Sequence, residues 1–168
     1  MILGLDVSSA MIGVALIDKK TKKLVKQSKI QLHRARIKDE YDKIDEIKEH
    51  LKEYADFNIE DIRVEAPFKA FGRGKSSATT LAILNRFNGI VCTLAYNQFK
   101  IRPVLVQVSA ARRKCKVIIN SSETIKQDVL KRVLDIEPSF VLESTRQGNY
   151  VPGTYDMADA FIVAYSGI

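Results

Sequence analysis

Three short apolar segments separated by tight polar turns open the chain, and this order limits the possible folds more than any other feature. Met1–Val7, Ile12–Asp18 and Leu24–Leu32 have the length and composition of strands. Ser8–Ala10 and Lys19–Lys23 join them and are short enough to be hairpin connections. The sequence therefore predicts a three-stranded antiparallel meander at the start of the chain.

Helical and strand patterns alternate in the rest of the chain. Apolar residues recur with helical period over Arg34–Tyr54, and Ile59–Glu65 follows as a fourth strand. The later predicted elements are helices at Ala78–Gln98, Ile125–Leu134 and Tyr155–Tyr165 and a strand at Pro103–Val108, whereas Ser109–Asn120 could be a short helix or a loop. A helical crossover makes the fourth strand parallel to the first. We therefore predict an α/β fold with a five-stranded mixed sheet of order 3-2-1-4-5 and helices on both faces.

The composition fits a single domain, residues 1–168, with a polyanionic partner. With 46% hydrophobic residues the chain can bury a substantial core, and its formal net charge of +7 favours nucleic acid. No apolar run approaches the roughly 18 residues of a membrane span, and we find no signal peptide. Cys92 and Cys115 lack metal-ligand spacing. We expect a cytoplasmic protein with reduced thiols and no membrane partner.

Four acidic residues stand where this fold would bring them together. Asp6 ends the first apolar run, Glu65 ends the fourth strand, and Asp156 and Asp159 lie three residues apart in the last helix. Strands 1 and 4 are neighbours, and residues i and i+3 share a helix face. Oxygen ligands without histidine suit a hard cation such as Mg²⁺. The set could hold two divalent cations roughly 4 Å apart, the arrangement used for phosphodiester cleavage.

Each acid also has an ordinary structural explanation. Asp6 could bond its own backbone in the turn, Glu65 could be a surface charge, and Asp156 could cap the last helix. Asp159 is flanked by alanines in an apolar helix and is harder to explain in this way. The coincidence of all four at matching topological positions favours a shared site.

Three segments carry these acids: Gly4-Leu5-Asp6-Val7-Ser8-Ser9, Val64-Glu65-Ala66-Pro67-Phe68 and Asp156-Met157-Ala158-Asp159-Ala160-Phe161. In this order they resemble the ribonuclease H-like superfamily and, within it, the RuvC-type Holliday junction resolvases. The resemblance covers essentially the whole chain. One departure is Val7-Ser8-Ser9 after the first acid, where the family often has Asp-Pro-Gly; Gly13 could supply tight packing in the next strand.

The resemblance implies a structure-selective endonuclease that cuts four-way DNA junctions as a homodimer with Mg²⁺ or Mn²⁺. Asp6, Glu65, Asp156 and Asp159 would be the catalytic residues and the ligands of two ions. One ion would activate a water molecule and the other would stabilise the leaving oxygen, which gives 5′-phosphate products. The stretch Ser109–Glu123 also lacks a clean bacterial-type pattern. The departures from the family pattern suggest a short phage- or virus-encoded relative, which would act in the cytoplasm of a bacterial host.

Aromatic and basic residues after the fourth strand are candidates for DNA contacts. Phe68 is followed by Lys69, Phe71, Arg73 and Lys75. The cations could meet phosphates and an aromatic ring could stack on an unpaired base. Alternatively, the two rings fill the core while the charges are solvated. By resemblance to the family, Phe68 would contact the centre of the junction.

A second basic run follows the fifth strand and includes Arg113, Lys114 and Lys116. This run could bind DNA or be a solvated loop. Lys126 lies at the start of the next helix, where the helix terminus favours phosphate. The resemblance implies that Lys126 and a lysine of the run flank the cations and the scissile phosphate.

The helix Ala78–Gln98 is apolar on more than one side, which fits either a helix buried on both faces or a dimer interface. We expect a twofold interface through Phe87, Val91 and Leu94, because two symmetric cuts need two active sites. His50, like the chain's other histidine, is expected at the surface, so no Ser/His/Asp nucleophile set is predicted.

Other functions remain open at this level. The same fold could act on RNA–DNA hybrids or on other branched DNA, or it could bind nucleic acid without cutting it. An actin-like or sugar-kinase-like phosphotransferase also begins with a hairpin that carries an aspartate. That class normally needs two such domains and a glycine-rich nucleotide cradle, and we find neither in the sequence.

Overall fold

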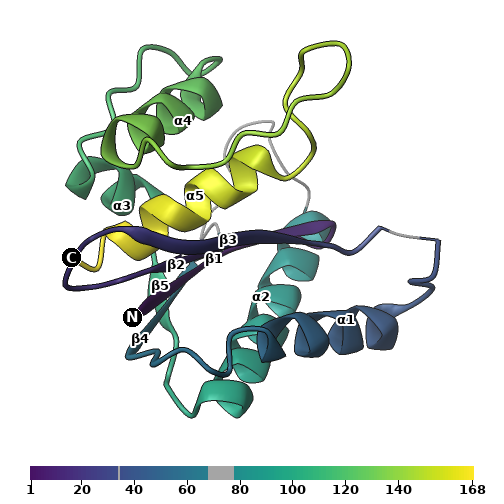
Figure 1. The fold of residues 1–168 in the computed structure, drawn as a ribbon. Coiled ribbons are helices and arrows are strands. Elements are labelled where there is room, and N and C mark those ends of the chain that lie inside the picture. Colours follow the sequence, from purple (N-terminus) through teal and green to yellow (C-terminus); the bar gives the residue numbers. More distant parts are fainter. Residues whose placement is uncertain (34, 68–77) are drawn as a thin grey trace.

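The computed structural model describes residues 1–33, 35–67 and 78–168, and these form a mixed sheet with helices on both sides (Figure 1). The strands are β1 (Ile2–Val7), β2 (Met11–Ile17), β3 (Leu24–Gln31), β4 (Asp61–Glu65) and β5 (Val104–Val106). The helices are α1 (Glu40–Lys52), α2 (Ala78–Phe99), α3 (Val108–Lys114), α4 (Ile125–Ile136) and α5 (Thr154–Tyr165).

The strand order is β3-β2-β1-β4-β5, so the predicted order is confirmed. Strands β1, β2 and β3 pair antiparallel, as hairpin connections require. Strand β4 pairs parallel to β1 because α1 carries the chain back across the sheet. Strand β5 then pairs parallel to β4 after the long helix α2. The carboxyl ends of β1 and β4 therefore lie side by side.

Side-chain alternation divides the sheet into two buried faces. Leu3, Leu5 and Val64 pack with α1 and α2 on one face. Ile2 and Ala15 pack with α3, α4 and α5 on the other. Figure 1 shows α1 and α2 below the sheet, α5 lying along its upper face, and α4 outside α5. The prediction of helices on both faces is confirmed.

Helix α1 begins later than the apolar period predicts, at Glu40 instead of Arg34. The Asp39 carboxylate accepts a hydrogen bond from the Asp42 amide and so caps the first turn. Tyr41, which we placed on the apolar stripe, is 77% exposed. A local cap decides where this helix starts, and periodicity alone could not show it.

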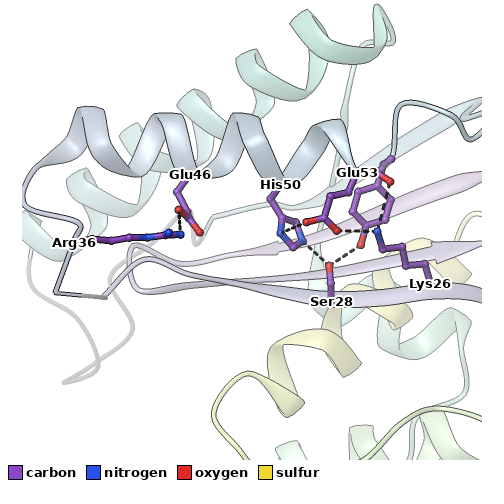
Figure 2. A network of polar contacts seen from close by, with 7 residues as sticks. Lys26, Ser28, Arg36, Glu46, His50 and Glu53 are labelled. Carbon is purple, nitrogen blue, oxygen red and sulfur yellow. Dashed lines mark hydrogen bonds and ion pairs between the residues drawn. The ribbon is translucent and has the colours of Figure 1, made fainter.

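Polar side chains fix α1 to strand β3, as Figure 2 shows. The Ser28 hydroxyl lies 2.7 Å from His50 Nε2 and 2.6 Å from the Tyr54 hydroxyl. Lys26 Nζ donates to the Glu53 carboxylate at 2.9 Å, and His50 Nδ1 lies 3.4 Å from the same carboxylate. Burial raises the pKa of Tyr54 to about 12.

His50 is therefore part of this network, and the expectation of a surface histidine was wrong for it. The order Ser28, His50, Glu53 resembles a nucleophile, a base and an orienting carboxylate. The Ser28 hydroxyl, however, is also engaged by Tyr54, a residue that is fully buried beneath α1. The set holds the helix on the sheet, and the Ser28 hydroxyl is occupied by two partners.

Two of the three residues of α2 that we expected at a dimer interface are instead buried in the core of a single chain. Phe87 is 3% exposed and Val91 is fully buried, both in the cluster that contains the sheet residues. Leu94 is half-buried against the same cluster. Any face that α2 offers to a second copy must therefore use other side chains, such as Ile83 and Tyr96, each 43% exposed. The broad apolar surface of this helix mainly reflects core packing.

The ambiguous segment Ser109–Asn120 begins with most of the helix α3 and continues as irregular chain. Strand β5 is shorter than predicted, because Gln107 is already the N-cap residue of α3, which starts at Val108. Among the described helices, none has the length and apolar character to cross a membrane.

Candidate active site

Asp6 and Glu65 reach the same face of the sheet through strand alternation. In β1, Leu3 and Leu5 face α1 and α2, so Asp6 takes the opposite face, on which Ile2 lies. Glu65 follows the same rule, because Val64 before it belongs to the α1 and α2 side. The parallel register pairs Leu5 with Val64, and its continuation places the next two residues, Asp6 and Glu65, beside each other.

Two glycines let helix α5 approach this face closely. A Cβ atom at Gly13 would lie 2.1 Å from the Asp156 carbonyl oxygen, and one at Gly4 would lie 2.2 Å from the Ala160 carbonyl oxygen. Gly13 is also the partner of Asp6 in the pairing of β1 with β2. The start of α5 therefore lies against the backbone next to Asp6. The packing role suggested by the sequence for Gly13 is confirmed.

The pKa values of Asp6, Glu65 and Asp159 are raised, in part by neighbouring carboxylates. Burial raises the pKa of Asp6 well above its usual value, and the charges of Glu65, Asp159 and Asp156 add to this rise. Burial is also the main cause of the raised pKa of Glu65 and of Asp159, and neighbouring carboxylates contribute to both. Acidic side chains from β1, β4 and α5 therefore lie near one another, and a bound cation would reduce the repulsion between their charges.

The side chains of Asp6 and Glu65 interact directly. The interaction between the two side chains raises the pKa of Asp6 and lowers that of Glu65. Asn88 from α2 supports the same strand end from the other side. Its Nδ2 donates to the Glu65 backbone carbonyl at 2.8 Å, and the side chain is only 4% exposed. Asn88 is a positioning residue that the sequence interpretation missed.

Arg112 of α3 is the second residue that was missed. Its Nη2 donates to Asp159 Oδ1 at 2.9 Å, and its charge lowers the pKa of both Asp159 and Glu65. The basic run was noted in the sequence, but other members of it were selected. Helical spacing is the signal that could have identified Arg112. Ala111 and Cys115 are four residues apart and buried, so they mark the inward face of α3, and Arg112 lies at the edge of that face.

The donor set suits a hard divalent cation, since four carboxylates offer only oxygen ligands. In the part of the chain that the structure describes, however, no three His, Cys, Asp or Glu side chains are grouped closely enough to bind a metal ion as they stand. Asp6, Glu65, Asp156 and Asp159 are therefore neighbours without forming a finished cage. The expectation of two bound ions stays a prediction.

The predicted DNA-binding residues have different positions. Lys126 lies near the start of α5: its Nζ is 5.7 Å from the centre of the Tyr155 ring, and its charge lowers the pKa of Asp159. Lys114 instead donates to the Ser166 carbonyl at 2.7 Å, at the far end of α5. Arg113 and Lys116 are exposed.

The other predicted contacts, Phe68, Lys69, Arg73 and Lys75, lie outside the described residues.

A cavity of about 320 Å³ opens beside the β1–β2 turn, and its lining includes Ser9. Other side chains of its wall are His33, Lys38, Lys43 and Arg86, together with Asp39 and Glu40. Cationic side chains therefore also approach this end of the sheet from α1 and α2.

Comparison with solved structures finds this fold in RuvC of Thermus thermophilus. One structure, of that protein in complex with a Holliday junction substrate, has a TM-score of 0.67 and 16% sequence identity, and the match covers 98% of this chain and 90% of that chain. A second structure of Thermus thermophilus RuvC has a TM-score of 0.64 and 15% identity, covering 98% and 91%. No protein-family model and no curated protein sequence matches the chain.

These matches define the class: a ribonuclease H-like α/β fold, as the sequence predicted. Within that class the chain has the fold of the RuvC-type resolvases, and the recognition based on its three acidic segments is confirmed at the level of fold. An origin in a phage or virus has no support in these comparisons.

Proposed function

We propose that this protein is a divalent-cation-dependent endonuclease that resolves four-way DNA junctions. The observation that carries the proposal is the convergence of Asp6, Glu65, Asp156 and Asp159 from two strand ends and one helix. The RuvC-type fold and the net charge of +7 add independent support. One of the structures with this fold is bound to a Holliday junction substrate, which favours the same substrate class for this chain.

The acids would hold the cation through their oxygen atoms. When bound, Mg²⁺ would supply the activation of water and the charge stabilisation needed to break a phosphodiester bond, with 5′-phosphate products. The chain's own contribution is positional. Gly13 and Gly4 bring α5 against the sheet, and Asn88 holds the Glu65 backbone. No side-chain nucleophile is part of the proposal.

Basic residues would hold the DNA around this site. Lys126 is the best placed of those described, because its charge already acts on Asp159. Arg113 and Lys116 are exposed, so they remain candidates for phosphates farther from the cut. We also propose that Phe68 and the cations after it contact the junction, as the family resemblance implies.

Paired cuts require two active sites, so we propose a homodimer. Its interface is expected to involve the exposed part of α2 around Ile83 and Tyr96, since Phe87 and Val91 are used within one chain. Light scattering at micromolar protein concentration measures this directly. A wild-type protein that stays monomeric, alone and on junction DNA, would exclude the dimer.

Three labelled substrates separate the candidate functions: a mobile four-way junction, a duplex of matching sequence and an RNA–DNA hybrid, each incubated with Mg²⁺. The proposal predicts cleavage of the junction, at paired positions, and not of the duplex. Cleavage of the hybrid alone would identify a ribonuclease H instead. Binding to the junction without cleavage of any substrate would identify a non-catalytic binding module.

A further inference from the structure

Arg112 forms the one ion pair that the structure describes at the carboxylate cluster. Its Nη2 lies 2.9 Å from Asp159 Oδ1, and the side chains of Arg112 and Asp159 are 20% and 14% exposed. The two residues come from different helices, α3 and α5, and are 47 positions apart in the chain. A contact this sheltered is weakly screened by solvent, so the guanidinium offsets a substantial part of the negative charge of Asp159.

The guanidinium is not fully satisfied in this position. Arg112 Nε is buried and has no hydrogen-bond partner among the described residues. An arginine with a purely structural role would normally form a hydrogen bond through Nε as well, because a buried N–H group without a partner is unfavourable. Arg112 is therefore held mainly by charge, through one donor nitrogen and one carboxylate.

We propose that Arg112 competes with the divalent cation for Asp159, so that the Arg112–Asp159 ion pair and cation binding oppose each other. This inference rests on the proposed function, because it takes Asp159 as a ligand of the cation. A carboxylate oxygen that accepts a charged hydrogen bond has less electron density to offer a metal ion. The positive guanidinium would also repel a divalent ion bound to the same carboxylate.

Two other roles for Arg112 make different predictions. If Arg112 only clamps α3 to α5, its removal lowers stability and leaves cation affinity unchanged. If it orients Asp159 for the cation, its removal weakens cation binding. Competition alone predicts that a neutral side chain at this position makes cation binding tighter, and linkage then requires that the cation stabilise this variant more than wild type.

The probe is Mn²⁺, with its free concentration followed by electron paramagnetic resonance in the presence of the full-length protein at one fixed pH. Arg112→Met removes the charge and keeps much of the side-chain length. Arg112→Lys restores a charge. Arg132→Met is the matched control, because Arg132 also anchors α3, through a 2.7 Å bond from Nε to the Cys115 carbonyl, without an ion pair to the carboxylates.

Competition predicts that Arg112→Met binds Mn²⁺ on the order of tenfold more tightly than wild type, equivalent to about 1.4 kcal/mol. Arg112→Lys should lie near wild type, and Arg132→Met should match it. The melting temperature of Arg112→Met should also rise more with Mn²⁺ than that of wild type. If the methionine variant does not fold, Arg112→Gln repeats the test, because it keeps a donor for Asp159 and lacks the charge.

Unchanged or weaker Mn²⁺ binding by the neutral variants would overturn the competition. Asp159→Asn distinguishes this failure from a failure of the proposed function. If Asp159→Asn weakens Mn²⁺ binding while Arg112→Met does not strengthen it, the cation site stands and the role of Arg112 falls. If Asp159→Asn binds Mn²⁺ as wild type does, Asp159 is no cation ligand and both proposals fail.

Discussion

Replacing Gly13 by alanine should separate the acidic helix from the sheet. The new Cβ atom would lie 2.1 Å from the Asp156 carbonyl oxygen, 2.2 Å from its carbonyl carbon and 2.6 Å from the Met157 nitrogen. All three are backbone atoms of α5, so no side chain can rotate away to make room. Ordinary contact begins at 3.4 Å, and the start of α5 must therefore move by about 1.3 Å.

This displacement predicts two measurable losses. Overpacking of this kind costs about 1–3 kcal/mol of folding free energy. Asp156 moves with the helix start while Asp6, which pairs with Gly13, stays in the sheet. A displacement of about 1 Å at an active site can reduce the rate by roughly 10²-fold. We therefore expect the single-turnover rate of junction cleavage to fall about 10²-fold.

Chemical denaturation and single-turnover cleavage should be measured side by side, with Gly89→Ala as the control. Gly89 lies inside α2, and a Cβ atom there would meet nothing within 4 Å. Gly89→Ala should therefore stabilise the protein by about 0.5–1 kcal/mol, and it serves as the control for the denaturation experiment. If Gly13→Ala is as stable and as active as wild type, the close contact of α5 with the sheet does not position the acids.

Further predictions concern the supports of the site, its protonation and its surroundings. Asn88→Ala should cost about 1–3 kcal/mol in denaturation experiments, because the Glu65 carbonyl loses a buried donor; an unchanged free energy would show that water replaces it. Because the folded-state pKa of Asp6 is raised, without divalent cations the contribution of Asp6 to folding stability should be lost as pH rises from about 4 through that raised pKa. The melting temperature should be measured against pH for wild type and for Asp6→Asn. The variant should lose less stability over this pH range, and parallel curves for the two proteins would refute the raised pKa of Asp6. The double variant Lys114→Ala, Lys116→Ala should weaken the salt dependence of junction affinity, whereas an equal slope would place this run away from DNA.

The sequence was sufficient to predict the arrangement of the sheet and to group the acids. Strand alternation and the order of connections determine which face Asp6 and Glu65 share, and both can be read from residue patterns. Residue patterns could not show which basic side chain of the run after β5 contacts the acids. Arg112 meets Asp159 because α3 is helical, and the sequence left that segment undecided.

Tertiary context decided the other differences. Phe87 and Val91 look equally suited to a core or to an interface, and only the position of α2 against the sheet shows that they are core. His50 is surrounded by charged residues in the sequence, yet its partner Ser28 lies on a strand 22 positions away. Contacts between distant segments of this kind leave no periodic signal in a single sequence.

The central claim is that the carboxylates of β1, β4 and α5 form one cation-dependent cleavage site for four-way junctions. Single-turnover cleavage of a labelled junction tests it most directly, with wild type and Asp159→Asn compared at equal junction occupancy, in Mg²⁺ and in excess chelator. The account predicts cleavage by wild type in Mg²⁺ only, and undiminished junction binding without cleavage by Asp159→Asn, because phosphate contacts do not need this carboxylate. Cleavage by Asp159→Asn at the wild-type rate, or cleavage by wild type in chelator, would contradict it.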